Sequence, residues 1–337
     1  MKIGILTSGG DCPGINATIR GVCKTAISHY GMEVYGIHNG FRGLIDGDIN
    51  PLNEKSLTGL LNLGGTILGT SREKPFKKRN ASAGAENKPA IILDTIRRFA
   101  FDCIVCIGGN GTQKTAAELV ASGVNVISIP KTIDNDVWGT DVSFGFDSAV
   151  SIATDAIDRL HSTASSHQRV MVIEVMGHKA GWIALYSGMA GGGDIILLPE
   201  IPFNIHHIGD AIISRLKQGK PYSIVVVAEG IPTLGGKKAA QYIAEEIEYE
   251  TGFETRETVL GYIQRGGSPT AFDRNLATRM GGHATELIAQ GRFGRMVSLR
   301  GAAITSVPIM DVAGKLKLVA EDNELIIQGR RMGICFG

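Results

Sequence analysis

The sequence predicts an α/β protein with two lobes and mostly parallel sheets. Short apolar segments rich in β-branched residues alternate with amphipathic segments of helical periodicity, which is the pattern of βαβ units. The chain has 337 residues, and one domain ordinarily takes roughly 100 to 200, so two lobes are expected. Two glycine-rich segments each follow a predicted strand directly, as loops do at the ligand-binding edge of an α/β sheet.

Individual elements follow from the same patterns. Short, apolar, β-branched runs predict strands at residues 3–6, 104–107, 124–129, 170–175, 195–198 and 224–228. Amphipathic periodicity predicts helices at residues 16–29, 113–121, 147–160, 208–218 and 239–248. Residues 77–88 (KKRNASAGAENK) are predicted to form an exposed loop.

The charge balance excludes two classes of partner. Acidic and basic side chains nearly cancel, leaving a formal net charge of +1, so binding to nucleic acid or to an anionic membrane is not indicated. No apolar run approaches the ~18 residues of a membrane-spanning helix. The start, MKIGILTSGGD, suits a first strand better than a signal peptide. We therefore expect a cytoplasmic protein.

Cys103 and Cys106 form a C-x-x-C sequence, a spacing found in zinc and redox sites. They lie within a predicted strand, where positions three apart point to opposite faces. No second Cys or His pair follows at zinc-site spacing. We expect buried, unreactive thiols.

Residues 3–11 (IGILTSGGD) and 103–112 (CIVCIGGNGT) share the order strand, glycines, polar residue, helix. Each loop can present backbone N–H groups and a helix N-terminus to an anion. Neither matches G-x-G-x-x-G or G-x-x-x-x-G-K-[ST], so a dinucleotide or Walker-type site lacks its main support. One such loop is weak evidence, because glycines also make ordinary turns. Two of them beside the strand 124–129 favour a phosphate site.

The segment 130–136 (PKTIDND) places two carboxylates, a hydroxyl and an amine directly after a predicted strand. In phosphoryl transfer the protein mainly positions the reactants and neutralises charge, which takes a base, a metal ligand and cations. Asp134 can accept the hydroxyl proton, Asp136 can hold Mg²⁺ directly or through water, and Thr132 can hydrogen-bond the transferred group. Lys131 supplies a positive charge. The alternative is an Asx-rich turn whose carboxylates cap a helix.

Three further arginines suit a phosphorylated acceptor, because the planar guanidinium group pairs well with phosphate oxygens. They are Arg169, Arg256 and Arg265. Each alone is equally compatible with a surface salt bridge. The basic run at residues 72–79 (REKPFKKR) is predicted to be a solvated loop, with the exception of Arg72.

Several long motifs occur in the order known from one enzyme family: LTSGGDCPGINATIRG, GGTILGTSRE, IGGNGT, PKTIDND, SSHQRVMVIEVMGHKAGW, VVVAEG and ETRETVLGYIQRGGSP. Through them the chain resembles the phosphofructokinases, which phosphorylate the 1-hydroxyl of fructose 6-phosphate with ATP or pyrophosphate. The resemblance implies two similar three-layer α/β lobes with the active site in the cleft between them. Residues 1–139 plus 253–303 would form the larger, donor-binding lobe, and residues 140–252 plus 304–337 the smaller, sugar-phosphate-binding lobe.

The resemblance also implies roles for single residues. It assigns Asp134 as the base, Thr132 to the transferred phosphate, the Gly9 N–H to the donor, and Arg72 to donor and transition state. The implied donor site consists of Gly9, Arg72, Glu73, Gly109, Asn110, Gly111 and Thr112. The implied sugar-phosphate site consists of Thr132, Ile133, Asp134, Arg169, Met176, Gly177, His178, Glu229, Arg256, Tyr262 and Arg265. In the family Arg169 and Arg256 come from a neighbouring subunit, so a homo-oligomer is expected, with a tetramer built from dimers as the usual form.

Two site positions depart from the family pattern. Asn110 stands where a metal-binding Asp is common. Its amide oxygen can ligate Mg²⁺ but brings no negative charge, so the affinity for the metal is expected to fall unless Asp136 or donor phosphates compensate. His178 stands where Arg often follows Met-Gly and is neutral for much of the time near pH 7, which could weaken a sugar or phosphate contact.

The two positions that distinguish the phosphate donors in this family, Gly111 and Lys131, point to different donors. Pyrophosphate-using relatives carry Asp at the position of Gly111 and Lys at that of Lys131, whereas many ATP-using relatives carry Gly at both. Gly111 leaves room for the α-phosphate of a nucleotide, which an Asp would obstruct and repel, so ATP is the expected donor. A pyrophosphate-dependent enzyme is the first alternative. A catalytically weak paralogue that binds sugar phosphate and regulates a partner is the alternative of another class.

The family's bacterial allosteric site uses basic residues. Arg20 and Lys24 are present at these positions, whereas His161 stands where an Arg is usual and Lys220-Pro221 replaces a more basic pair. Activation by ADP and inhibition by phosphoenolpyruvate are expected to be weak or absent.

Overall fold

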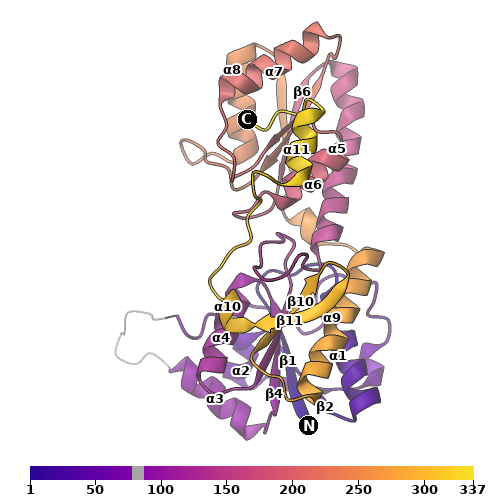
Figure 1. Ribbon diagram of the computed structural model, residues 1–337, viewed down its shortest axis with the longest axis vertical. Coiled ribbons are helices and arrows are strands. Elements are labelled where there is room, and N and C mark those ends of the chain that lie inside the picture. The colour runs from indigo at the N-terminus through magenta and orange to yellow at the C-terminus, as the bar shows by residue number, and fades with distance from the viewer. Residues whose placement is uncertain (78–86) are drawn as a thin grey trace. The chain divides into compact units, whose positions relative to one another are not determined.

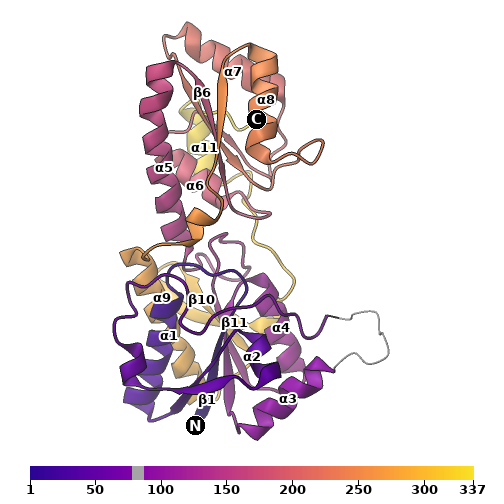
Figure 2. The same ribbon diagram turned by 180° about the vertical axis from the view of Figure 1, so that it is seen from behind.

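The computed structural model describes residues 1–77 and 87–337, which form two compact units. Unit 1 comprises Met1–Thr132, Val137–Gly145 and Arg265–Leu316. Unit 2 comprises Ile133–Asp136, Phe146–Gln264 and Lys317–Gly337. In each unit, helices cover both faces of a central sheet, so each is a three-layer α/β structure (Figures 1 and 2). Most of the loop predicted at 77–88, and the end of the basic run 72–79, lie outside the described residues.

The sheet of unit 1 has seven strands in the order β11-β10-β5-β4-β1-β2-β3. The strands are β1 (Lys2–Ser8), β2 (Glu33–Ile37), β3 (Ile49–Leu52), β4 (Cys103–Gly108), β5 (Val126–Pro130), β10 (Arg295–Arg300) and β11 (Ala303–Pro308). The inner strands pair in parallel, whereas β3 and β11 pair antiparallel at the two edges. β4 and β5 are buried along their whole length, because helices cover both faces of a parallel sheet.

The helices of unit 1 are α1 (Ile15–Lys24), which continues as a π-helical turn (Thr25–His29), α2 (Phe41–Asp46), α3 (Lys88–Arg98), α4 (Asn110–Ala121), α9 (Ala271–Ala289) and α10 (Ile309–Val312), with a 3₁₀ turn at Glu54–Leu57. Two glycines bring α1 and α9 into backbone contact. A Cβ on Gly21 would lie 2.7 Å from the Thr278 carbonyl oxygen, and one on Gly281 would lie 2.7 Å from that of Thr18. A larger side chain at either glycine would push the two helices apart.

The sheet of unit 2 has four parallel strands in the order β7-β8-β6-β9. The strands are β6 (Val170–Val175), β7 (Ile195–Leu197), β8 (Ser223–Ala228) and β9 (Thr255–Val259). The helices are α5 (Phe146–His167), α6 (Trp182–Ala190), α7 (Ile205–Lys217), α8 (Ala239–Thr251) and α11 (Glu324–Arg331), and a 3₁₀ turn (Gly261–Arg265) follows β9. α7 packs against α8, and α6 packs against both α5 and α11 (Figure 1).

The predicted α/β class with mostly parallel sheets is confirmed, as are the six predicted strands and five predicted helices, with shifted ends. The division of the chain differs from the predicted ranges. Residues 253–264 fall in unit 2 rather than with 265–303, because β9 pairs with β6. Residues 304–316 fall in unit 1, because β11 forms a hairpin with β10 that the predicted boundary at 303 cuts through.

The cysteines are free thiols, and four of the five are buried. Cys103 and Cys106 lie within β4, where burial raises the pKa of both thiols. The prediction of buried thiols at this C-x-x-C sequence is confirmed. Burial also raises the pKa of Cys12 to about 12 and that of Cys23 to about 12.

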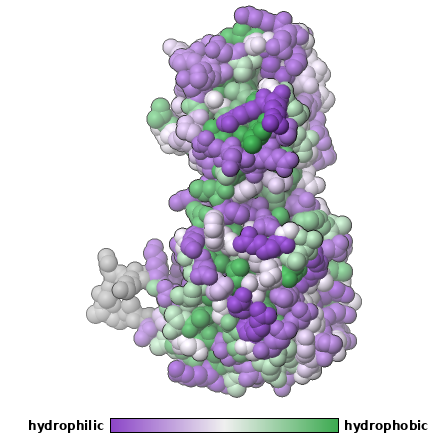
Figure 3. Space-filling view, in the orientation of Figure 1, coloured by the Kyte–Doolittle hydropathy of each residue, from purple (hydrophilic) through white to green (hydrophobic). Residues whose placement is uncertain are grey.

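The face of the molecule shown in Figure 3 is mostly hydrophilic, with apolar patches in both units. Large side chains with high exposure include Tyr249, Tyr262 and Leu234. Among residues 1–77 and 87–337, no helix has the length and apolar character needed to cross a membrane.

Candidate active site

The carboxyl ends of three adjacent parallel strands meet at one edge of the sheet in unit 1. Ser8 at the end of β1 lies opposite Gly108 of β4, which in turn lies opposite Pro130 of β5. β2 lies on the other side of β1, so the chain reverses its direction across the sheet between β1 and β4. Open α/β sheets bind ligands at such a switch point. The prediction that the two glycine loops neighbour the segment 130–136 is confirmed.

The loop between β4 and α4 leaves the amino end of α4 open. Gly109 is the N-cap residue and has no side chain that could cap the helix, and the amino end of a helix carries a partial positive charge that favours an anion. Asn110 is the first helical residue. A Cβ on Gly111 would have no atom within 4 Å, so the space beside it is open. Thr112 is buried instead, and its hydroxyl donates to the Ser8 carbonyl at 3.3 Å, which joins this loop to β1.

The loop after β1 is held by the segment that contains Thr70 and Ser71. Gly9 has a φ of +85°, which glycine adopts without strain. Its N–H donates to the Ser71 carbonyl at 3.0 Å, and its carbonyl accepts the Thr70 hydroxyl at 2.6 Å. The N–H that the sequence assigns to the donor is therefore engaged within the protein in this structure.

The next two residues of that segment are Arg72 and Glu73. The side chain of Arg72 is exposed. The carboxylate of Glu73 accepts a hydrogen bond from the Lys88 ammonium group at 2.9 Å, and both side chains are about four-fifths buried. Arg72 can therefore reach a ligand, whereas Glu73 anchors the segment to the start of α3.

Lys131 is a buried cation beneath the glycine loop, with only 2% of its surface exposed. Its ammonium group donates to the carbonyl of Ser8 at 3.2 Å and to that of Gly10. A buried ammonium group is costly unless polar groups surround it, and these carbonyls supply that environment. The sequence left open whether Lys131 touches the donor. The structure places its ammonium group on the loop, where it braces the backbone on both sides of Gly9.

The segment after Lys131 is largely buried. Thr132 is 8% exposed, and its carbonyl accepts the Ser143 hydroxyl at 3.0 Å. Asp134 is half-buried, between the fully buried Ile133 and the buried Asn135. Asn135 has a φ of +53°, in the left-handed region that Asn tolerates better than most residues. The turn at Asn135 redirects the chain immediately after Asp134.

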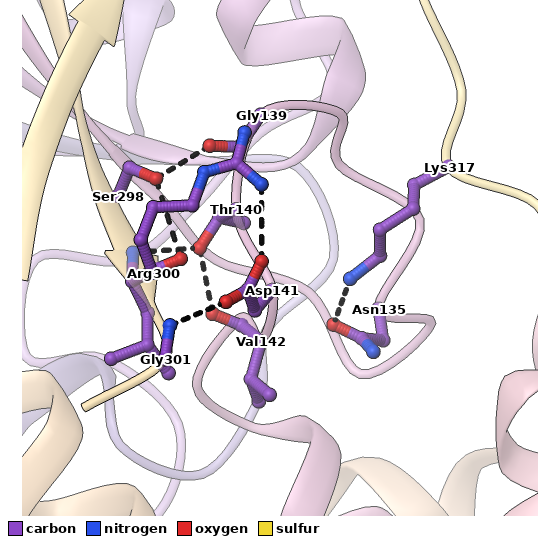
Figure 4. Close-up of polar contacts among 10 residues, drawn as sticks. Asn135, Gly139, Thr140, Asp141, Val142, Ser298, Arg300, Gly301 and Lys317 are labelled. Atoms are coloured by element: carbon purple, nitrogen blue, oxygen red, sulfur yellow. Dashed lines mark hydrogen bonds and ion pairs between the residues drawn. The ribbon is translucent and has the colours of Figure 1, made fainter. Parts of the chain in front are cut away.

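The following loop, Val137–Gly145, is fixed to the β10–β11 hairpin of unit 1 (Figure 4). The Ser298 hydroxyl donates to the Gly139 carbonyl at 2.5 Å. The Asp141 carboxylate accepts from the Arg300 guanidinium at 3.1 Å. Contacts distant in sequence thus hold the chain immediately after the segment 133–136.

In unit 2, a second loop forms where β6 and β8 end. Val175 of β6 lies opposite Ala228 of β8, and Glu229 follows directly. One carboxylate oxygen of Glu229 accepts from the N–H groups of Gly177, at 3.2 Å, and His178, at 2.8 Å. Both residues have positive φ, +148° and +55°. Glu229 therefore shapes the loop that contains the predicted sugar-phosphate contacts.

Tyr262 and Arg265, which both belong to the predicted sugar-phosphate site, lie in the same 3₁₀ turn, Gly261–Arg265. Tyr262 is 77% exposed at the start of the 3₁₀ turn. Arg265 belongs to unit 1, where its guanidinium donates to the Asp11 carbonyl at 3.2 Å. A Cβ on Gly10 would lie 2.7 Å from the same guanidinium. Arg265 thus packs on the glycine loop of the predicted donor site.

Arg169 and Arg256 share one carboxylate at the amino end of β6. Arg169 donates to Glu254 at 2.7 Å, and Arg256 pairs with the other oxygen of Glu254. The hydrogen bond from Arg169 lowers the pKa of Glu254. Met176 and Gly177 follow the opposite end of the strand, roughly 20 Å away at ~3.3 Å per residue. Within one chain, the structure therefore does not bring these arginines to the predicted sugar-phosphate loop.

Comparison with known proteins decides the family. A family model described as phosphofructokinase matches residues 2–288. The chain belongs to the phosphofructokinase family. The resemblance read from the motifs is confirmed.

Three relatives illustrate this membership. The chain is 77% identical over 337 residues to the ATP-dependent 6-phosphofructokinase 3 of Bacteroides thetaiotaomicron, with 100% of each chain covered. It is 45% identical over 337 residues to a pyrophosphate–fructose 6-phosphate 1-phosphotransferase of Streptomyces coelicolor, covering 95% of this chain and 96% of that one. The solved phosphofructokinase structure from Saccharomyces cerevisiae has a TM-score of 0.82 and 30% identity, covering 93% of this chain but only 45% of that chain.

Sequence reasoning missed Gln264, which lies inside the phosphofructokinase motif between Tyr262 and Arg265. Gln264 is fully buried, and its side-chain oxygen accepts from the Met176 N–H at 2.8 Å. Because the N–H of Met176 is a donor, the oxygen rather than the nitrogen of the amide must face it. Its position within the motif ETRETVLGYIQRGGSP was the available signal. Gln264 and Glu229 together shape the Met176–His178 loop from two sides.

The donor set for Mg²⁺ in this phosphofructokinase is small. Among the residues that the structure describes, no three His, Cys, Asp or Glu side chains gather to hold a metal ion. Mg²⁺ usually keeps several waters and binds through one or two side chains together with substrate phosphates. The amide of Asn110, in unit 1, and the carboxylate of Asp136, in unit 2, each offer an oxygen atom of the kind that Mg²⁺ accepts.

A separate surface pocket of about 470 Å³ lies on unit 1 of this phosphofructokinase. Its lining includes Arg20, Lys24, Glu54 and Lys55. Two of these are the basic residues that the sequence assigns to the allosteric site. His161 lies in unit 2, where its ring nitrogens are hydrogen-bonded to the Tyr222 hydroxyl at 3.2 Å and the Gly191 carbonyl at 2.7 Å.

Proposed function

We propose that this chain is an ATP-dependent 6-phosphofructokinase, which transfers the γ-phosphoryl group of ATP to the 1-hydroxyl of fructose 6-phosphate. The observation that carries the proposal is the meeting of two glycine loops and the segment 130–136 at the switch point of the seven-stranded sheet. The Bacteroides thetaiotaomicron relative is 77% identical over the full length of both chains and is named an ATP-dependent 6-phosphofructokinase, which supports both the reaction and the donor.

The donor would bind at the loops of unit 1. The open amino end of α4 offers N–H groups and a positive dipole end to the phosphates. The space beside Gly111 accommodates the α-phosphate of a nucleotide. Arg72 can add a paired contact from its exposed position. Lys131 contributes positive charge from beneath the loop while it holds Ser8 and Gly10 in place.

The acceptor would bind at the Met176–His178 loop of unit 2, and the exposed Tyr262 would add a contact to it. Asp134 takes the proton from the 1-hydroxyl as that oxygen attacks the γ-phosphorus. The new oxygen–phosphorus bond forms, and the bond between the γ-phosphorus and the bridging oxygen of ADP breaks. Thr132 hydrogen-bonds the group in transfer. Asn110 and Asp136 are the residues that would contact a Mg²⁺ ion brought in with the donor phosphates, and such an ion would neutralise charge on the phosphates.

Pyrophosphate dependence is the second candidate, and two observations bear on it. The lysine found in pyrophosphate-using relatives is present as Lys131, and one relative named for pyrophosphate is 45% identical. The open space at Gly111 weighs the other way, because a pyrophosphate enzyme has no α-phosphate to accommodate. We therefore place ATP first.

A coupled assay of fructose 1,6-bisphosphate formation tests the proposal. With Mg²⁺ and fructose 6-phosphate, we expect faster turnover with ATP than with pyrophosphate, and loss of turnover when a chelator removes Mg²⁺. Faster turnover with pyrophosphate would reverse the donor assignment. Binding of fructose 6-phosphate by calorimetry without turnover with either donor would instead favour a regulatory paralogue.

Arg169 and Arg256 would complete the site of a neighbouring copy in a homo-oligomer. Their place at the opposite end of β6 from Met176 supports this assignment. Mixing inactive Asp134→Ala with inactive Arg169→Ala subunits should then restore activity. Each hybrid dimer has one site with both residues intact, so random mixing should give roughly a quarter of wild-type activity at low fructose 6-phosphate.

The matched control for this experiment mixes Asp134→Ala with Thr132→Ala. Both residues belong to the same chain's site, so every site of a hybrid lacks one of them and activity should stay low. Native mass spectrometry verifies that hybrids form. Verified hybrids of the Asp134 and Arg169 variants without recovered activity would show that each chain builds its site alone.

A further inference from the structure

The segment after β11 contacts the turn that follows the proposed base. The Lys317 ammonium group donates to the side-chain oxygen of Asn135 at 2.9 Å (Figure 4). The Lys317 N–H donates to the carbonyl of Asp136, also at 2.9 Å. Asn135 is 2% exposed and Asp136 is 5% exposed, so both contacts lie in a mostly water-free environment. One residue thus holds the two positions that follow Asp134.

Lys317 is itself anchored to the start of α6. Its carbonyl accepts the indole N–H of Trp182 at 2.9 Å, and its ammonium group lies 5.2 Å from the centre of the Trp182 ring. Two residues later, the N–H of Val319 donates to Glu200 at 2.9 Å. The carboxylate of Glu200 also accepts from the N–H of Gly181, which is the N-cap residue of α6. All of these residues belong to unit 2.

The backbone at Asn135 explains why such an anchor matters. Asn135 holds a left-handed φ of +53° directly after Asp134, and a change in this φ would alter the path of the chain that joins Asp134 to Asp136. A hydrogen bond from an ammonium group is stronger than one from a neutral donor. A misplacement of about 1 Å at a reacting group can cost ~10²-fold in rate.

We propose that Lys317 is a positioning residue for Asp134, acting through Asn135 and Asp136. This rests on the proposed function, in which Asp134 is the base. Lys317 lies beyond residues 2–288, the range that the family model matches. The contact therefore joins the segment 133–136 to a part of the chain outside that range.

Lys317→Met tests the proposal, because it keeps much of the side-chain length and removes the charged donor. We expect kcat to fall by ~10- to 10²-fold while the KM values for ATP and fructose 6-phosphate change little. Lys317→Arg should recover part of the loss, because a guanidinium group can still donate to Asn135. Lys315→Met is the matched control: Lys315 is exposed on the same segment, and its loss should leave kcat unchanged.

A second variant tests whether Lys317 affects kcat through its contact with Asn135. Asn135→Gly keeps a residue that adopts a left-handed φ but removes the tethered amide, so kcat should fall here too. If Lys317 acts through Asn135, the double variant should be no slower than the slower single variant. Fully additive losses would overturn the inference. Asn135→Gly also remains informative if Lys317→Met does not fold.

The indole N–H resonance of Trp182 reports, without any assay of turnover, whether the Lys317 ammonium group lies beside the Trp182 ring, the position from which it reaches Asn135. The chain has two tryptophans, so a Trp138→Phe background leaves this signal alone. We expect it to shift in Lys317→Met. An unshifted resonance, or wild-type kcat in Lys317→Met, would overturn the inference alone. An inactive wild-type protein would overturn the proposed function first and the inference with it.

Discussion

Replacing Asp134 by alanine is expected to lower kcat by ~10²- to 10⁴-fold or more, because a general base contributes on this scale. The affinity for fructose 6-phosphate should stay close to that of the wild type, since the loop shaped by Glu229 and Gln264 does not involve Asp134. Steady-state kinetics gives kcat, and calorimetry with fructose 6-phosphate gives the affinity. Asp134→Asn, which keeps the shape of the side chain, should be impaired to a similar degree.

The control for this prediction is Asp155→Asn. Asp155 is an exposed carboxylate of α5 paired with Arg159, so its loss should change neither kcat nor folding appreciably. Thermal unfolding of both variants separates a catalytic loss from a loss of structure. A rate near that of the wild type in a folded Asp134→Ala protein would remove Asp134 from its role as base.

Gly111→Asp is expected to lower kcat/KM for ATP by on the order of 10²- to 10³-fold, and that for pyrophosphate far less. Two like charges about 4 Å apart repel by about 4 kcal/mol at an effective dielectric constant near 20. The space beside Gly111 is open, so the protein can accept the aspartate, and the cost falls on the α-phosphate that only ATP carries. Measuring kcat/KM with each donor gives the two losses directly.

Two matched variants at this position separate bulk from charge. Gly111→Ala adds one methyl group to open space in the first turn of α4, so ATP use should change little. Gly111→Asn has the shape of aspartate without its charge, and its effect should lie between the other two. Equal losses with both donors in Gly111→Asp would count against the steric and electrostatic argument for ATP.

The fold could be predicted where a strand is continuously apolar. β4, β5, β6 and β8 are such strands, and each was identified from its residues. β9 (TRETV) was missed, because four of its five residues are partly or fully exposed and it carries two charges. α9 was missed because its buried face mixes large apolar residues with polar and small ones, such as Asp273, Gly281 and Thr285, which weakens the periodic apolar signal.

The candidate site could be predicted only where a short run of residues carries the signal. Local motifs identified the loops at Gly9 and Gly109 and the segment 130–136, because each carries its chemistry within a few residues. Contacts across long sequence distances could not be identified. The Gly9 N–H is engaged by Ser71, and the buried ammonium group of Lys131 lies against a carbonyl 121 residues away. Only folding brings such partners together.

Cys12 has a consequence for the chemical durability of this site. The thiol lies fully buried at the glycine loop, and burial raises its pKa to about 12. Oxidants and alkylating reagents attack an accessible thiolate, and burial disfavours both access to this thiol and its ionisation. The Cys12 thiol at the loop proposed to receive the phosphates should therefore react slowly with oxidants. Oxidation of this thiol should not be a route by which the loop loses its shape.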